Sequence, residues 1–117
     1  MHETLRLHPA VPEIVRVATK DDVVPLAKPV LTREGNIVDS LFLEKGSSIA
    51  IPFEYINQAT DIWGPTAKEY MPERWLDGSV QKDLPGYRHM LAFPDGPRTC
   101  LGKTFALTEL KVLPWPL

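Results

Sequence analysis

Proline is the residue that most restricts how this chain can fold. Twelve of its 117 residues are proline, against an average usage of about 5%, and they are spread along the sequence rather than clustered. Because proline fixes φ and lacks a backbone N–H, it interrupts helices and central strands. The sequence therefore predicts short helices, short strands and turns, in one domain or less.

Composition argues against several classes of protein. The formal net charge is −2, so nucleic acid is not expected as a partner. No run reaches the ~20 apolar residues of a membrane span, and the charged Glu3 and Arg6 do not fit a secretory signal. The single cysteine, Cys100, cannot form an intrachain disulfide or supply a four-cysteine metal site.

The first half of the sequence predicts one short helix and several strands. Residues 1–8 are expected to form a helix that stops at Pro9, because the residue before a proline is disfavoured in the helical region. Apolar and β-branched runs predict strands at 13–19, 29–33, 36–41 and 48–53. Gly35-Asn36 predicts a hairpin and residues 44–46 a second turn. The charged stretch 20–24 is interpreted as a solvated loop.

The second half is expected to contain less regular structure. Helical segments are predicted at 54–60, Gly64–Tyr70 and 101–113. The apolar side chains expected near one face of the last helix are Leu101, Phe105, Leu107 and Val112. Residues 71–90 are interpreted as ordered coil, and Pro114 and Pro116 are expected to end the final helix.

Cys100 lies where a glycine-containing loop meets the predicted final helix. The partial positive charge of a helix N-terminus and the full charge of Arg98 both favour the thiolate, the form of cysteine that binds iron or attacks an electrophile. Gly96 and Gly102 allow a bulky flat group to approach the backbone. The alternatives are a buried structural cysteine, a reactive thiol and a Cys100–His89 nucleophile pair.

A family resemblance is carried by this loop, which has the spacing Phe93-x-x-Gly96-x-Arg98-x-Cys100-x-Gly102. The spacing resembles the haem-binding signature of the cytochrome P-450 family, the haem-thiolate monooxygenases. The resemblance implies that Cys100 is the proximal ligand of haem iron, whose electron donation helps to split the O–O bond. It also implies that Arg98 pairs with a haem propionate and that Phe93 packs beside the ligand.

Three charged residues carry a second resemblance. Glu3 and Arg6, three apart on one helix face, resemble the family's Glu-x-x-Arg helix, and Arg74 within Pro72–Trp75 resembles their third partner. The resemblance implies a buried charge network that locks the coil under the haem, which is a structural role. Because a buried charge is costly once its partner is removed, all three are expected to be sensitive to substitution. Taken alone, the Glu3–Arg6 spacing also fits an exposed helix pair.

Arg16 is the last candidate, in the predicted strand at 13–19. The resemblance implies that it reaches the other side of a haem propionate, and a surface strand arginine is the alternative. Residues 10–15 are then expected to border the substrate pocket. Ile56-Asn57 and Trp63–Pro65 are most similar to fungal microsomal members of the family.

The resemblance implies an α+β fragment of a mostly helical fold. It would contain a helix stub, a small β region, a meander coil, the Cys-ligand loop and a final helix. We interpret residues 1–117 as the C-terminal haem-binding part of an incomplete domain. The implied function is oxidation of a small organic substrate with electrons from a reductase, in a longer parent at the endoplasmic reticulum membrane. We expect the isolated chain to be inactive, and a non-catalytic haem-binding or scaffold remnant is the alternative.

Overall fold

The computed structural model describes residues 1–76, 90–94 and 96–113. The chain forms two compact units: a helical unit of Met1–Glu13 and Pro52–Leu117, and a strand unit of Ile14–Ile51. Within the described ranges, no helix is both long enough and apolar enough to cross a bilayer.

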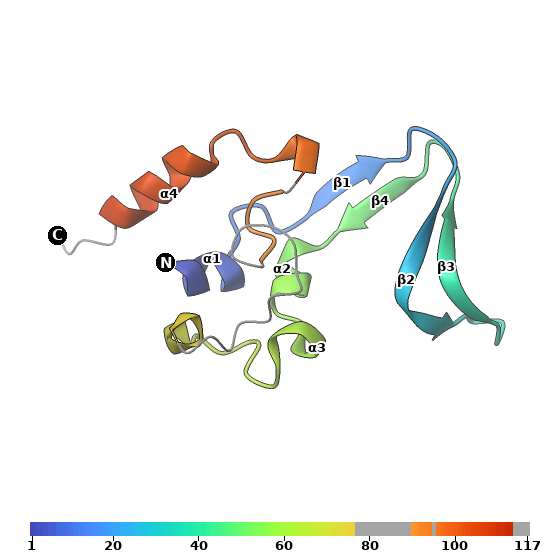
Figure 1. The fold of residues 1–117 in the computed structure, drawn as a ribbon, viewed down its shortest axis with the longest axis horizontal. Coiled ribbons are helices and arrows are strands. Elements are labelled where there is room, and N and C mark those ends of the chain that lie inside the picture. The colour runs from blue at the N-terminus through green and yellow to red at the C-terminus, as the bar shows by residue number, and fades with distance from the viewer. Residues whose placement is uncertain (77–89, 95, 114–117) are drawn as a thin grey trace. The chain divides into compact units, whose positions relative to one another are not determined.

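The strand unit consists of two antiparallel ladders (Figure 1). β1 (Ile14–Val17) pairs with β4 (Ser48–Ile51), and β2 (Asp22–Leu31) pairs with β3 (Ile37–Leu43). Backbone pairing continues beyond the ends of β1 and β4. The Ala18 N–H donates to Ser47 O at 2.9 Å, and the Gly46 N–H donates to Ala18 O at 2.8 Å. These pairings confirm that all four predicted strands exist, with different bounds.

The hairpin predicted at Gly35-Asn36 is confirmed, but its turn is longer than two residues. The Thr32 N–H donates to Asn36 O at 2.8 Å, and the Gly35 N–H donates to Thr32 O at 3.0 Å. The Asn36 N–H donates to Thr32 Oγ1 at 3.2 Å. Gly35 has a φ of 85°, a conformation that a residue with a Cβ adopts only with strain.

The interpretation of residues 20–24 as a loop is wrong for its second half, because β2 begins at Asp22. The charges of this stretch suggested a loop, yet β2 also continues through Pro25 and Pro29. In a two-stranded ladder, one edge of each strand has no partner strand. A proline whose missing N–H would point to that edge therefore costs no inter-strand hydrogen bond. The register also shifts between Pro25 and Val30, which accommodates both prolines in one long strand.

In its described residues, the helical unit contains six short helical elements. They are α1 (His2–Leu7), α2 (Phe53–Asn57), α3 (Thr60–Trp63), the 3-10 turns η1 (Pro72–Trp75) and η3 (Gly96–Arg98), and α4 (Lys103–Val112). The helix predicted at 1–8 is confirmed and ends before Pro9. Phe53, predicted in a strand, instead begins α2, because Pro52 has no N–H with which to continue a ladder.

The helix predicted at Gly64–Tyr70 does not form, and the helical turn lies one step earlier, in α3. α3 ends at Gly64, whose φ is 78°. After it the backbone makes only turns, with the Ala67 N–H on Gly64 O and the Glu69 N–H on Thr66 O. The carbonyls of Ala67 and Glu69 accept hydrogen bonds from the Arg6 guanidinium instead. Arg6 thus supplies donors to carbonyls in a stretch that makes only turns.

The core of the helical unit brings distant segments together. Its buried residues are Leu5, Trp63, Ala67, Met90 and Phe93. α4 packs on this core through Ala106, Leu107 and Leu110. The predicted apolar face is therefore wrong except for Leu107, because Phe105 and Val112 are mostly exposed. Most of the predicted coil at 71–90 lies outside the described residues, as do Pro114 and Pro116. In the described part of that coil, η1 forms a short 3-10 turn.

Candidate functional site

Glu3 is a buried carboxylate that accepts five hydrogen bonds. Its side chain lies on α1 and the residue is 1% exposed. Oε1 accepts from Arg6 Nη2 at 2.7 Å, Arg74 Nε at 2.9 Å and the Met71 N–H at 3.0 Å. Oε2 accepts from Arg6 Nε at 3.0 Å and Trp75 Nε1 at 2.9 Å. The carboxylate thus joins α1 to the chain around η1.

Arg6 is completely buried, and all five of its N–H donors are used. Nε and Nη2 hold the Glu3 carboxylate in a bidentate pair. Nη2 also donates to Glu69 O at 3.2 Å, and Nη1 donates to Asn57 O at 2.6 Å and to Ala67 O. The guanidinium lies 5.0 Å from the centre of the Trp63 ring. Arg6 therefore binds three backbone carbonyls from two separate stretches of the chain, one at Asn57 and one at Ala67 and Glu69.

Arg74 lies on η1 and completes the charge network of Glu3, Arg6 and Arg74. Its Nη2 donates to Thr66 O at 2.9 Å, while its Nε contacts Glu3 as above. Trp75, the next residue, was not singled out from the sequence. Its indole packs 6.0 Å from that of Trp63, and its N–H completes the shell around Glu3. Trp75 could have been identified from the sequence by its place beside Arg74 in the Pro72–Trp75 motif.

The pKa of Glu3 is far below its ordinary value. Burial alone raises the pKa of this carboxyl, but hydrogen bonds from Arg6, the Met71 backbone, Trp75 and Arg74 outweigh that cost. Together they lower the pKa from 4.5 to about 2. The folded state therefore holds Glu3 ionised at a pH where the unfolded chain is already protonated.

This shift predicts an acid-sensitive contribution to stability. A depressed carboxyl pKa stabilises the fold above pH ~4.5, and that stabilisation is lost as the pH falls toward 2. The total is on the order of 3 kcal/mol. The free energy of unfolding of wild type and Glu3→Gln should therefore converge as the pH falls. A difference that stays constant across that range would show that Glu3 does not titrate between the two states.

The ligand loop, residues 93–102, leads from the core into α4. Within it the Thr99 N–H and Oγ1 both donate to Gly96 O, at 3.0 Å and 2.9 Å. The Lys103 N–H donates to Cys100 O at 3.3 Å. Cys100 is half-buried and packs against the core that contains Phe93. The thiol is thus held at the start of α4 and is open on one side.

The two motif glycines serve different needs. Gly96 has a φ of 74°, so its conformation itself favours glycine. Gly102 has a φ of −81°, which any residue can adopt. A Cβ at Gly102 would lie 3.9 Å from Cys100 Sγ. Glycine at this position therefore leaves the space beside the sulfur clear.

Apolar side chains near the thiol are left uncovered. Leu101 is fully exposed, and Phe105 on α4 is 68% exposed. Arg98, on η3, is exposed as well. Open space at Gly102, two apolar side chains and a cation suit a flat apolar group with anionic substituents.

The donor set around Cys100 limits which kind of metal group it could hold. In the described part of the chain there is no group of three or more His, Cys, Asp or Glu residues that could hold a metal ion. A metal bound by Cys100 alone must be coordinated mainly by something else, as iron is in haem. The residues around Cys100 therefore fit haem better than a zinc site, which needs three or four protein ligands.

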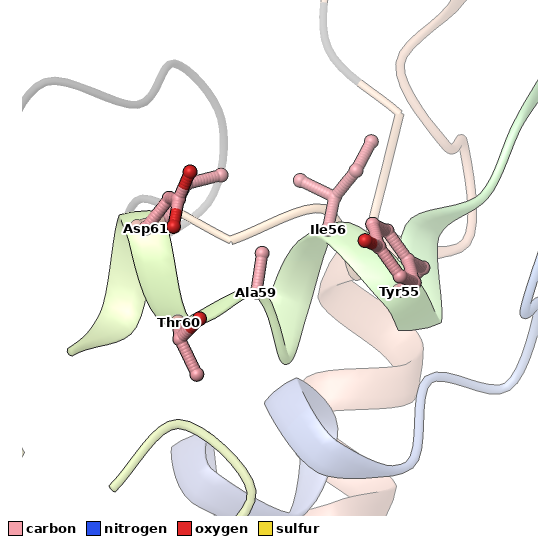
Figure 2. Close-up of a pocket in the computed structure, with 6 residues that line it drawn as sticks. Tyr55, Ile56, Ala59, Thr60 and Asp61 are labelled. Atoms are coloured by element: carbon pink, nitrogen blue, oxygen red, sulfur yellow. The ribbon is translucent and has the colours of Figure 1, made fainter. Parts of the chain in front are cut away.

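The remaining candidates are Arg16 and His89. Arg16 lies on β1 in the strand unit, exposed, with Nη1 3.4 Å from Val15 O, and its role at a propionate stays a prediction. His89, the partner in the nucleophile-pair alternative, lies outside the described residues. Figure 2 shows a pocket of about 300 Å³ on α2 and α3. Its lining comes from residues 55–62, so it is separate from the ligand loop.

Comparison with known proteins agrees with this geometry. The family model described as Cytochrome P450 matches residues 1–114. The chain belongs to the cytochrome P-450 family. Cytochrome P-450 monooxygenase claW of Ampulloclitocybe clavipes is 50% identical over 97% of this chain and 22% of its own length. For claU of the same fungus the identity is 47% over the same shares.

A more distant cytochrome P-450 relative comes from another fungus. Cytochrome P-450 monooxygenase 205 of Postia placenta is 41% identical over 97% of this chain and 21% of its own length. The resemblance to this family is therefore confirmed, and similarity to fungal members is confirmed with it. The chain spans about a fifth of the length of these relatives.

Proposed function

We propose that residues 1–117 are the haem-binding part of a haem-thiolate monooxygenase, with Cys100 as the iron ligand. The observation that carries the proposal is the half-buried Cys100 thiol, beside the space left by Gly102 and the exposed Leu101 and Phe105. Family membership and the names of the relatives as monooxygenases support it.

The chain's own residues would prepare the thiolate. Cys100 precedes α4, whose N-terminal N–H groups lower the energy of a nearby negative charge. Arg98 adds a positive charge from η3, and its guanidinium suits a propionate carboxylate. Phe93, in the core beneath the loop, limits water on the protein side of the sulfur. Gly96 and Gly102 allow the loop to turn and the flat group to approach.

Bound haem would supply the oxygen chemistry, in which one oxygen atom of O2 enters an organic substrate and the thiolate's electron density favours O–O cleavage. The electrons would come from a reductase. The substrate would be a small organic molecule, and the parent protein would reside at the endoplasmic reticulum membrane. Arg16 would reach the other side of a propionate.

The charge network would keep the ligand loop in place without touching the reacting atoms. Glu3, Arg6 and Arg74 connect α1 to η1, and Arg6 packs on Trp63 in the same core as Cys100. A rigid support of this kind holds a metal ligand within the narrow geometry that its bond requires.

The test is the absorption spectrum of the reduced, CO-bound protein after haem loading. Wild type should give the long-wavelength Soret band of thiolate-ligated haem, and Cys100→Ala should lose it completely. Met90→Leu is the matched control, because it removes a different sulfur from the same core at nearly constant volume. That variant should keep the band.

Two results contradict the proposal. One is a thiolate band that survives in Cys100→Ala. The other is a wild-type protein that takes up no haem while its Cys100 reacts rapidly with an alkylating reagent, as the reactive-thiol alternative predicts.

A further inference from the structure

Asn57, the last residue of α2, has a completely buried side chain. Its Oδ1 accepts a hydrogen bond from the Leu91 N–H at 2.8 Å, and its Nδ2 donates to Leu91 O at 3.4 Å. Its own backbone carbonyl accepts from Arg6 Nη1 at 2.6 Å. One residue therefore contacts both the charge network and the segment that leads into the ligand loop.

Leu91 belongs to a short segment that is anchored on both sides. Its neighbours Met90 and Phe93 are buried in the core on which Cys100 packs. At the far end of the loop, the hydrogen bond from the Lys103 N–H to Cys100 O joins the ligand residue to α4. The Asn57 amide thus fixes the approach to the loop, and α4 fixes its exit.

We propose that Asn57 is a positioning residue for Cys100. By holding the Leu91 backbone, its amide sets where the Cys100 sulfur lies relative to the iron; this inference rests on the proposed function. An asparagine amide suits the task because it offers one donor and one acceptor to a residue that presents the complementary pair. Because the Asn57 side chain is completely buried, its amide has a free-energy cost to meet if either hydrogen bond is lost.

Two neighbouring amides of the helical unit provide a matched comparison. Asn57→Asp keeps the size of the side chain and the acceptor for the Leu91 N–H, but turns a second oxygen toward Leu91 O. Gln58→Glu makes the same amide-to-carboxylate change one residue later. Gln58 Nε2 donates to Leu7 O at 3.0 Å, so this control disturbs the α1 side of α2 and leaves the Leu91 contact intact.

The experiment measures the reduced, CO-bound spectrum of the haem-loaded protein at one fixed pH, with urea unfolding followed separately by circular dichroism. Asn57→Asp should lower the ratio of the thiolate-ligated band to the band of haem that has lost the thiolate on the order of tenfold. Gln58→Glu should leave this ratio at the wild-type value, even if its urea midpoint falls.

The inference is overturned if Asn57→Asp keeps the wild-type ratio, or if Gln58→Glu changes it equally. Asn57→Ser is the second variant in case the aspartate does not fold. If neither folds while Gln58→Glu does, Asn57 serves only the fold and the inference is overturned too. These results leave the proposed function standing. A thiolate band that survives in Cys100→Ala removes the proposed function and this inference together.

Discussion

Replacing Glu3 by glutamine is expected to lower the free energy of unfolding by about 3–5 kcal/mol. Glutamine has nearly the same shape, so the cost does not come from a cavity. It comes from two buried guanidinium groups, Arg6 and Arg74, which lose the negative charge that balances them. The glutamine amide nitrogen would also face donors where the carboxylate offered only acceptors.

Urea unfolding at neutral pH measures this loss. Glu73→Gln is the matched control, because Glu73 lies on η1 beside Arg74 but is exposed. Exposed charges contribute little, so the control should stay within about 0.5 kcal/mol of wild type. Equal effects of the two substitutions would contradict the view that a buried charge network supports this unit.

Replacing Arg6 by lysine should cost a similar amount, about 3 kcal/mol or more, although the charge is kept. Lysine carries its three donors on one nitrogen, whereas Arg6 directs five donors to a carboxylate and three backbone carbonyls. Several buried acceptors would therefore be left without a donor, each at a cost of about 1–3 kcal/mol before the site relaxes. The contact of the planar guanidinium with Trp63 would be lost as well.

Arg33→Lys, an exposed position in the β2–β3 turn, provides the comparison and should be nearly neutral. Combining Glu3→Gln with Arg6→Lys should cost less than the sum of the single changes, because the two residues contact each other. An Arg6→Lys protein as stable as wild type would mean that the positive charge alone stabilises this unit, without the planar five-donor geometry of the guanidinium.

Local sequence signals were enough to predict most of the short elements. Gly35 and Gly46 indicated turns, and both adopt the positive φ that glycine favours. Pro9 indicated the end of the first helix. The errors arose where a distant contact decided the structure. Residues 64–70 have a helical pattern but form only turns, and two carbonyls of this stretch, those of Ala67 and Glu69, bind Arg6, about sixty positions away.

The final helix shows a different limit. The spacing of Leu101, Phe105 and Val112 suggests a core-facing stripe, yet the residues that contact the core are Ala106, Leu107 and Leu110. Periodicity reports that a helix has apolar residues, and packing decides which of them are buried. Leu101, which directly follows Cys100, remains exposed, as do Phe105 and Val112.

The charge network illustrates what a family resemblance adds to physical reasoning. Three-residue spacing alone fits an exposed pair as well as a buried one, so burial of Glu3 and Arg6 could not be read from the spacing. The resemblance supplied Arg74 as a partner 68 residues beyond Arg6 in the sequence, and the structure brings the three together. The roles of Trp75 and Asn57 depend on contacts with residues far away in the sequence, which spacing alone does not reveal.

The most direct test of the central claim is X-ray absorption at the iron edge of the haem-loaded protein. The account predicts one sulfur atom in the first coordination shell of the wild-type iron, together with the porphyrin nitrogens. That sulfur should disappear in Cys100→Ala and remain in Met90→Leu. A wild-type shell that contains only nitrogen or oxygen would contradict the assignment of Cys100 as the iron ligand.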